Sequence, residues 1–418
     1  MARKVAALIV IFIGCSIGWF ALGSSVLYRT RFYDANLEQK VRLLWGGEHW
    51  QTAPVITYVV RKPQEQEEIS PDGTKKVKIV YIAEDVAVPL ESSDIAVKLF
   101  YEPRKKGLLW YGTYRVRFDA RYGFRNPTAE KQPMTVRFSF PSSEAQYDDF
   151  QLVGPDGPLT AASVGAGVTF TTELDPGERF EFRISYRSRG LARWVYKFAP
   201  QQGYGYGAGG AAVTEVRSFR LVMDTDFPRI DFPEGNMSPN TKTRSGEGWR
   251  LVWKYSRLVT GRTIGLQLPE ELNPGPLASR ITFFAPVSLL FFLFILFIVC
   301  VLRGVALHPM HYFFLSLSFF AFHLLFAYLV DHVEVHAAFL VSSAASIALV
   351  VSYIRIVAGA RFAFVETALL QLVYLVLFSY SHFFKGYTGL IVTVFAVLTL
   401  FVVMQLTARV KWDEVFRR

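Results

Sequence analysis

The chain has 418 residues, of which 51% are hydrophobic and 16% aromatic, and its formal net charge is +10. So many aromatic residues, 37 Phe among them, indicate lipid contact rather than one water-soluble domain. Only Cys15 and Cys300 are cysteines, and both stand in apolar runs, which excludes a disulfide scaffold or cysteine-based metal site between them. Residues 28–280 hold 35 basic and 30 acidic residues, so we expect no nucleic-acid partner, which would require a concentrated basic face.

The first apolar run, Val5–Leu27, carries no charge over 23 residues. As a helix it spans about 34 Å, enough for a bilayer core of about 30 Å. Arg3 and Lys4 precede it, as in a signal peptide, and Ala21 with Gly23 could suit a peptidase. A signal peptide has a much shorter apolar region, however, so we interpret residues 1–27 as an uncleaved transmembrane anchor. Leu37, Val41 and Leu44 share one helical face, so a helix over Phe32–Leu44 is expected to follow.

Residues 28–278 alternate between apolar and polar positions in many short stretches. Tyr114–Tyr122 and Arg179–Tyr186 show this period of two most plainly, and further stretches cover Thr135–Phe140, Val168–Leu174, Ser218–Met223 and Arg250–Tyr255. The pattern is typical of half-buried strands with one face on a core. Turn signals separate the stretches, at Pro71-Asp-Gly73, Gly154–Gly157, Asp175–Gly177 and Ser245–Gly248. An all-β extracytoplasmic domain resembling a β-sandwich is therefore predicted, with Pro269–Pro276 as the linker that follows it.

Few groups in this β-rich stretch could carry chemistry. Gly205–Gly210 matches the G-x-G-x-x-G pattern, but a dinucleotide site needs a following helix and an acidic residue, so we interpret it as a Gly/Tyr loop. The stretch has a single histidine, His49, with no nucleophile motif beside it. The adjacent pairs Asp148-Asp149 and Glu270-Glu271 are expected in solvated loops. We therefore predict no catalytic residues, no cofactor and no metal here.

Residues 279–407 contain five further apolar runs joined by short connections. The predicted spans are Ile281–Leu302, Tyr312–Val330, Ala337–Ile354, Phe362–Tyr380 and roughly Gly389–Leu406. Backbone polar groups must be satisfied internally in lipid, so these runs are expected to be helices. The fold class is thus mixed: the β domain is inserted between one N-terminal helix and a bundle of five transmembrane α-helices, and residues 408–418 form a tail.

The distribution of Lys and Arg predicts the orientation. With the N-terminus in the cytoplasm, nine basic residues lie inside: Arg3, Lys4, Arg303, Arg355, Arg361, Arg409, Lys411, Arg417 and Arg418. The two short outside loops hold only Lys385, whereas Arg29, Arg31 and Arg280 argue slightly the other way. Both termini are therefore expected in the cytoplasm and residues 28–280 in the periplasm of a bacterium, with the protein in the inner membrane.

Six histidines belong to the membrane block. His308 and His311 have the i, i+3 spacing of one helix face. Asp331-His332-Val-Glu334-Val-His336 fills an outside loop, and in extended backbone the side chains of His332, Glu334 and His336 would point the same way, as zinc or copper ligands could. Their spacing is not a structural-zinc pattern, so an interfacial polar loop is the favoured interpretation.

Two ionisable residues fall inside predicted spans. His323 is in the middle of the predicted span Tyr312–Val330. Glu366 lies about one and a half turns into the predicted span Phe362–Tyr380. Such groups are costly in a membrane and usually face a bundle interior. Glu366 either has a functional role or pairs with Arg361 or Arg355, or reaches to the interface. His323 either has a functional role or makes an interhelical hydrogen bond.

The C-terminal block resembles the CreD family of bacterial inner-membrane proteins. The resemblance rests on Leu307-His-Pro-Met-His-Tyr312, on Asp331-His332 and on Arg409-Val-Lys-Trp412. The family usually has Gln where this chain has His311, and Glu where it has Asp331. The resemblance implies a role in cell-envelope integrity and in the response to envelope stress, without catalytic residues to carry over.

Three hypotheses follow for the function. The leading one is a non-enzymatic envelope protein whose periplasmic domain binds a protein or cell-wall component. A transporter or channel would use His323 and Glu366. A metal-dependent membrane enzyme would use His308, His311, Asp331 and His332, but these positions lie about 30 Å apart along one helix, so it would need ligands from other spans.

Overall fold

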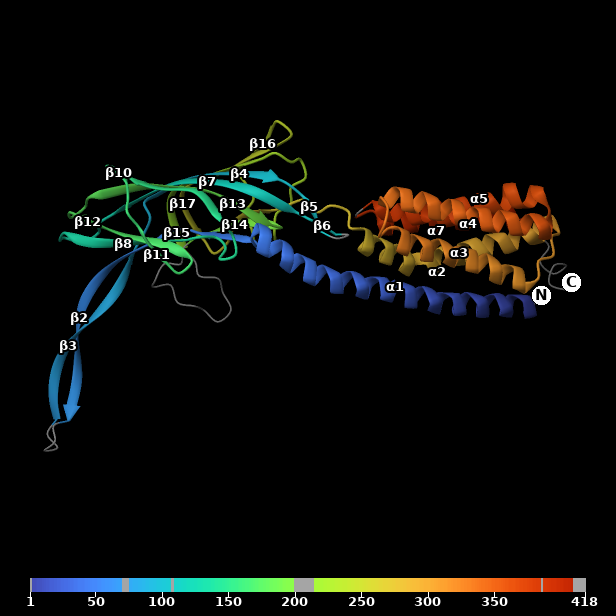
Figure 1. Cartoon of the computed structure of the whole chain (residues 1–418), viewed down its shortest axis with the longest axis horizontal. Helices are drawn as coiled ribbons and strands as arrows, with labels where there is room; N and C mark the ends of the chain where they lie inside the picture. The colour runs from blue at the N-terminus through green and yellow to red at the C-terminus, as the bar shows by residue number, and fades with distance from the viewer. Residues whose placement is uncertain (1, 70–74, 107–108, 199–213, 385, 409–418) are drawn as a thin grey trace. The chain divides into compact units, whose positions relative to one another are not determined.

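The computed structural model describes residues 2–69, 75–106, 109–198, 214–384 and 386–408 (Figure 1). The chain forms two compact units. The helical unit comprises residues 1–36, 107–109 and 272–418, and the β unit comprises residues 37–106 and 110–271. The structure thus has a large β-rich part together with several apolar helices, as the composition predicted.

The helices fall close to the predicted apolar runs. Their bounds are α1 Ala2–Trp45, α2 Pro274–Arg303, α3 Pro309–Leu329, α4 Val335–Ala358, α5 Ala368–Gln371, α6 Phe378–Tyr380 and α7 Thr388–Thr407. The predicted span at Phe362 contains two π-helical segments, η1 Phe362–Thr367 and η2 Leu372–Leu377, and ends in a 3₁₀ turn, η3 Ser381–Phe383. Helix α1 includes the expected extension over Phe32–Leu44.

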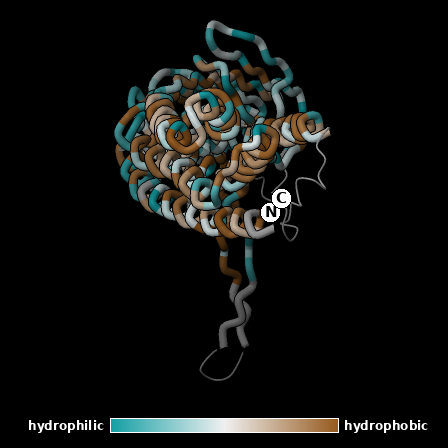
Figure 2. The backbone as a smooth tube through the Cα atoms, turned by 90° about the vertical axis from the view of Figure 1, so that its right-hand side faces the viewer, coloured by the Kyte–Doolittle hydropathy of each residue, from teal (hydrophilic) through white to brown (hydrophobic). Residues whose placement is uncertain are grey.

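Among the described residues, six helical stretches are long and apolar enough to cross a membrane. They are Val5–Trp45, Pro274–Arg303, Pro309–Leu329, Val335–Ala358, Phe362–Phe383 and Thr388–Thr407. Figure 2 shows the brown of hydrophobic residues along these helices. Backbone hydrogen bonds within each helix satisfy the polar groups that a bilayer cannot.

The β unit contains eighteen strands within the described residues. Their bounds are β1 His49–Thr52, β2 Val55–Ile69, β3 Lys75–Val88, β4 Ser92–Tyr101, β5 Arg104–Lys106, β6 Leu109–Tyr111, β7 Thr113–Arg125, β8 Gln132–Ser139, β9 Tyr147–Gly154, β10 Gly157–Pro158, β11 Ala162–Val164, β12 Gly167–Leu174, β13 Arg179–Leu191, β14 Arg193–Lys197, β15 Thr214–Thr225, β16 Thr241–Ser245, β17 Gly248–Thr260 and β18 Ile264–Gln267. The alternating stretches of the sequence all lie in strands, as predicted, apart from an end residue such as Phe140.

Two sheets make up most of the β unit. An eight-stranded sheet has the order β10-β9-β13-β7-β4-β15-β17-β16, and a five-stranded sheet has the order β11-β12-β8-β2-β3. Neighbours in both are antiparallel except β15 and β4, which are parallel. Smaller sheets join β1-β14-β18 and β5-β6.

Aromatic side chains on the inward positions of the strands build the core of the β unit. Phe118 of the eight-stranded sheet contacts Phe138 of the five-stranded sheet, with ring centroids 6.2 Å apart, and Phe170 contacts Phe182 at 5.4 Å. All four rings are nearly or fully buried. Because side chains of a strand alternate between faces, charged neighbours such as Arg183 stay at the surface.

One predicted loop is a strand. Asp148 and Asp149 lie in β9, which pairs with β13, rather than in a solvated loop. The register shifts between Ser185 and Arg187, and Asp149 has a positive φ of 52°, so the strand contains a bulge. A bulge interrupts the period of two, which hides the strand from a pattern-based prediction. Asp149 pairs with Arg187 at 2.8 Å on the surface.

The first hairpin of the five-stranded sheet extends well beyond its neighbours. β2 pairs with β8 only from Val55 to Thr57, whereas its pairing with β3 continues from Ile56 to Ile69. Beyond Thr57 the two strands form a two-stranded ribbon, called the arm below, which extends away from the other strands of the sheet (Figure 1). The turn predicted at Pro71-Asp-Gly73 lies outside the described residues.

Candidate functional site

The loop of residues 330–334, called the 330-loop, joins α3 to α4, and its Asp331 forms an ion pair with Arg29 of α1. A guanidinium nitrogen of Arg29 lies 2.9 Å from a carboxylate oxygen of Asp331 and donates a hydrogen bond of 3.1 Å to the Ala327 carbonyl. The same guanidinium stacks 5.2 Å above the ring of Tyr328. Arg29 thus attaches α1 to the end of α3, and Asp331 is its charged partner.

The two acidic residues of the 330-loop have different surroundings. Burial raises the pKa of the Asp331 carboxyl above its ordinary value, and the positive charge of Arg29 opposes that shift. Glu334 caps α4: its carboxylate accepts hydrogen bonds from the backbone N–H groups of His336 at 2.9 Å and Ala337 at 3.0 Å. These hydrogen bonds lower the pKa of Glu334, that from His336 most. The cap satisfies N–H groups that the first turn of a helix leaves unpaired.

The histidines of this region do not share a direction with Glu334. The 330-loop is a turn and α4 begins at Val335, so the alternation of extended backbone, on which the metal hypothesis depended, does not apply. The ring of His336 stacks on Phe383, with centroids 5.0 Å apart, and His332 is exposed. Within the part of the chain that the structure describes, no three His, Cys, Asp or Glu side chains are grouped as metal ligands would be.

The other end of α3 shows what the Leu-His-Pro motif does locally. His308 is the N-cap of α3, and its Nδ1 accepts a hydrogen bond of 3.3 Å from the Met310 backbone N–H. Pro309 fits the first helical position, where a backbone N–H would have no partner. His311 lies next to His308, as its spacing predicted, and its Nδ1 is 2.6 Å from the Tyr353 hydroxyl of α4.

Glu366 has a partner that the sequence did not indicate. Its carboxylate lies 2.9 Å from a guanidinium nitrogen of Arg303 at the end of α2, rather than pairing with Arg361 or Arg355. The Glu366 side chain is only 12% exposed, and its Oε2 has no hydrogen-bond partner among the described residues. Glu366 thus pairs with a cation of a neighbouring helix, and this cation is Arg303.

His323 is fully buried beside α1. Its Nδ1 lies 2.8 Å from the Phe319 carbonyl of its own helix, so this hydrogen bond is intrahelical, whereas one of the two alternatives from the sequence was an interhelical bond. Trp19 of α1 is also fully buried and meets the imidazole edge-on, with centroids 5.6 Å apart. His323 Nε2 and Trp19 Nε1 both lack a hydrogen-bond partner in the described part of the chain.

A buried polar group between α3, α4 and α5 was missed by sequence reasoning. Gln371 is fully buried, and its Nε2 donates to the Ser346 hydroxyl at 2.8 Å, which in turn donates to the Ser318 carbonyl at 2.7 Å. Gln371 Oε1 and the hydroxyl of buried Thr367 have no partner among the described residues. The sequence signal that could have revealed this site is Gln371 itself, an amide side chain inside the apolar run Phe362–Tyr380. The π-helical segments η1 and η2 flank it, and such segments are frequent at functional sites.

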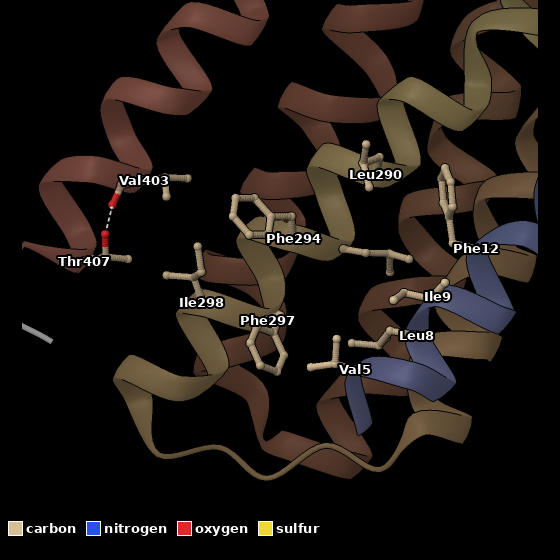
Figure 3. Close-up of a pocket in the computed structure, with 11 residues that line it drawn as sticks. Val5, Leu8, Ile9, Phe12, Leu290, Phe294, Phe297, Ile298, Val403 and Thr407 are labelled. Atoms are coloured by element: carbon tan, nitrogen blue, oxygen red, sulfur yellow. Dashed lines mark hydrogen bonds between the residues drawn. The ribbon is translucent and has the colours of Figure 1, made fainter. Parts of the chain in front are cut away.

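An apolar groove of about 390 Å³ lies between α1, α2 and α7 (Figure 3). Phe12, Phe294 and Phe297 are among its lining residues, and Thr407 is its polar exception. The Thr407 hydroxyl donates to the Val403 carbonyl of its own helix at 2.7 Å, so it is already satisfied. The groove therefore suits hydrocarbon rather than a polar solute.

The β unit offers little for catalysis among its described residues. His49 is fully buried against Tyr114, with ring centroids 5.5 Å apart, and burial lowers its pKa to about 3. It is therefore neutral at ordinary pH and closed to a substrate. The loop Gly205–Gly210 and the motif Arg409-Val-Lys-Trp412 lie outside the described residues.

Comparisons with known proteins show similarity to one protein family and distant similarity to two solved structures. The profile of the family described as inner membrane protein CreD matches residues 238–413. No curated protein matches the chain. A Legionella pneumophila protein for which nutrient binding has been proposed is 10% identical, with a TM-score of 0.34, covering 57% of this chain and 75% of its own. An M1 zinc metallopeptidase from Deinococcus radiodurans is 9% identical, with a TM-score of 0.26, covering 43% and 42%.

The membrane-length helices with polar pairs at their ends define a multi-pass membrane protein. The family match supports the resemblance seen in the sequence: residues 238–413 are similar to the CreD family of inner membrane proteins. The lipid bilayer is accordingly the surroundings of the helices.

Proposed function

We propose that this protein supports cell-envelope integrity as a non-enzymatic binding protein. Residues 28–278 would form a periplasmic β-sandwich that binds a protein or cell-wall component, and residues 279–407 would anchor it beside the first helix. The family match supports the inner-membrane location. Arg355 in the last turn of α4 and Arg361 just after that helix are both exposed, and they support a cytoplasmic position for the connection to the next span.

The arm of the β unit is the observation that carries the proposal. One face of the ribbon presents Val59, Ile79 and Tyr81, with exposed fractions of 47%, 60% and 67%. Cross-strand pairing places Tyr81 opposite Pro63, which is also exposed, so the apolar side chains form one stripe. Exposed charges on the same face, Arg61 and Asp85, border this stripe, and an apolar patch rimmed by charges is typical of a protein-binding surface.

The test removes the apolar stripe and leaves the fold intact. In a null strain, Ile79→Thr/Tyr81→Thr is compared with the parent at matched abundance, with survival under envelope-targeting antibiotic and detergent as the readout. Val259→Thr is the matched control, because Val259 is 64% exposed on another strand of the same unit. We expect survival to fall for the arm variant only. Full protection by the arm variant would refute the arm as the binding surface.

Transport of a small cation or proton is the second candidate function. It is favoured by Glu366 Oε2, Thr367 Oγ1 and Gln371 Oε1, which have no hydrogen-bond partner among the described residues. Unpaired polar atoms in a bundle are costly unless water or an ion contacts them. Under this hypothesis Glu366 binds the ion, and Gln371 lines its route.

Glu366→Gln and Gln371→Leu test it in proteoliposomes. The variants should lose proton or cation flux while they keep the abundance and thermal stability of the parent, with exposed Thr393→Val of α7 as the control. No flux from the parent would remove this hypothesis.

The remaining candidate residues receive structural positions under the leading proposal. His308 and Glu334 cap the first turns of α3 and α4, His311 contacts Tyr353 of α4, and Asp331 pairs with Arg29 of α1. His332 and His336 are exposed. The metal-dependent enzyme hypothesis would need ligands from both ends of α3, which the length of that helix keeps apart.

A further inference from the structure

We propose that the arm pairs with the arm of a second copy of this chain, β3 against β3 in antiparallel orientation. This inference rests on the proposed function, because it names the partner of the apolar arm. The strand order, the charge pattern and the apolar side chains of β3 favour a second copy over an unrelated peptide.

The outer edge of β3 is open in the described part of the sheet. β3 is the last strand in the order β11-β12-β8-β2-β3, and its described ladder runs only to β2, from Lys75 to Val88. A strand edge carries unpaired N–H and C=O groups that can bond to another strand. A two-stranded ribbon is also marginal in water, whereas four strands are not. Pairing of two arms along this edge would bond the unpaired backbone groups and would convert two two-stranded ribbons into one four-stranded sheet.

The charges along β3 favour an antiparallel copy of the same strand. The strand begins with Lys75 and Lys76, followed by Lys78, and later carries Glu84 and Asp85. Antiparallel pairing brings the basic half of one copy to the acidic half of the other. A register centred on Val80 sets Lys76 opposite Glu84 and Lys75 opposite Asp85, twice by symmetry. Parallel pairing in register would set like charges side by side.

The same register also gives the exposed apolar side chains a partner. Ile79 of one copy then stands opposite Tyr81 of the other, and the reverse pair lies on the other side of the axis. Both side chains are more than half exposed in the single chain. Cross-strand pairs of an aromatic with a β-branched residue stabilise antiparallel sheets. This one register therefore gives hydrogen-bond partners to the edge of β3, opposite charges to its Lys and acidic residues, and apolar partners to Ile79 and Tyr81.

Charge exchange in the full-length protein tests the proposal. The basic variant Glu84→Lys/Asp85→Lys and the acidic variant Lys75→Glu/Lys76→Glu are extracted in detergent, alone and co-expressed with different tags. Light scattering and co-purification should show a dimer for the parent, monomers for each variant alone, and a mixed dimer for the pair. Glu173→Lys, an exposed change on β12, is the matched control and should stay dimeric.

Cysteine scanning tests the register. Val80→Cys, at the axis, should form an intermolecular disulfide on oxidation. Ala83→Cys should not, because two such residues would lie about 20 Å apart along the strands. The parent, whose Cys15 and Cys300 lie in helices, provides the background.

A monomeric parent, dimers of both variants alone, or equal crosslinking at the two cysteines would overturn the inference. If the parent is monomeric while Ile79→Thr/Tyr81→Thr still loses survival, the proposed function stands and its partner is another molecule. If the parent is dimeric through β3 but the arm variant survives fully, the dimer stands and the proposed function falls.

Discussion

At the scale of single residues, His49 couples the β unit to pH. It is fully buried on β1, and burial lowers its pKa to about 3. The unfolded chain binds a proton there below about pH 6.5, whereas the folded chain does not until about pH 3, so stability falls as pH decreases through this window. The slope is up to about 1.4 kcal/mol per pH unit.

We therefore expect His49→Phe to remove part of the acid sensitivity of the β unit. Between pH 6.5 and 5 the parent should lose about 1–2 kcal/mol more stability than the variant. Guanidinium unfolding of the full-length protein in detergent, followed by tryptophan fluorescence, measures the difference. His332→Gln, an exposed histidine of the helical unit, should keep the parental slope. Equal slopes for parent and His49→Phe would contradict a neutral buried imidazole.

The Arg29–Asp331 pair predicts an asymmetry between its two partners. Burial of the carboxylate outweighs the attraction of Arg29, since the Asp331 pKa is raised despite the pair. Arg29→Gln leaves that buried charge unpaired and should cost about 1–3 kcal/mol. Asp331→Asn removes the charge and should cost less than about 1 kcal/mol, because Arg29 keeps its hydrogen bond to the Ala327 carbonyl.

Unfolding of the helical unit in detergent measures both changes. Arg187→Gln, which removes one partner of an exposed pair in the β unit, should cost almost nothing. Equal costs for Arg29→Gln and Asp331→Asn would show that the pair, rather than desolvation, dominates the site.

At the scale of elements, α1 packs on α2 through a small residue. A Cβ on Gly23 would lie 3.2 Å from the ring of Phe283, and the Gly23 carbonyl accepts a hydrogen bond of 3.1 Å from buried Ser279. Close approach of this kind is how membrane helices associate without a hydrophobic driving force. The anchor is thus a packed member of the helical unit.

Gly23→Leu should separate α1 from α2 and cost about 1–3 kcal/mol through overpacking. Gly14→Leu is the matched control on the same helix, because nothing lies within 4 Å of its added Cβ. Thermal unfolding in detergent should show a lower Tm for Gly23→Leu alone. Similar Tm values for the two variants would mean that α1 and α2 do not pack closely.

At the scale of the whole molecule, the packing of α1 predicts that the first helix is retained. Trp19 and Val26 are buried in the core of the helical unit, and Arg29 binds Asp331. Cleavage near Gly23 would uncover that core and remove several of its contacts. Intact-mass measurement of protein extracted from membranes should give a chain that still contains residues 1–27. A dominant shorter species would show that a peptidase acts before the bundle assembles.

The sequence by itself determined the kinds of element and most of their places. Apolar runs of about twenty residues and stretches of period two are patterns of neighbouring residues, so they can be recognised without knowing the tertiary contacts. The tertiary structure alone decided the partners. The contacts of Arg29 with Asp331, of Arg303 with Glu366 and of Gln371 with Ser346 join segments far apart in the chain, and no periodicity encodes which segments meet. The bulge at Asp149 and the long arm likewise arise from pairing between strands, so only the folded chain shows them.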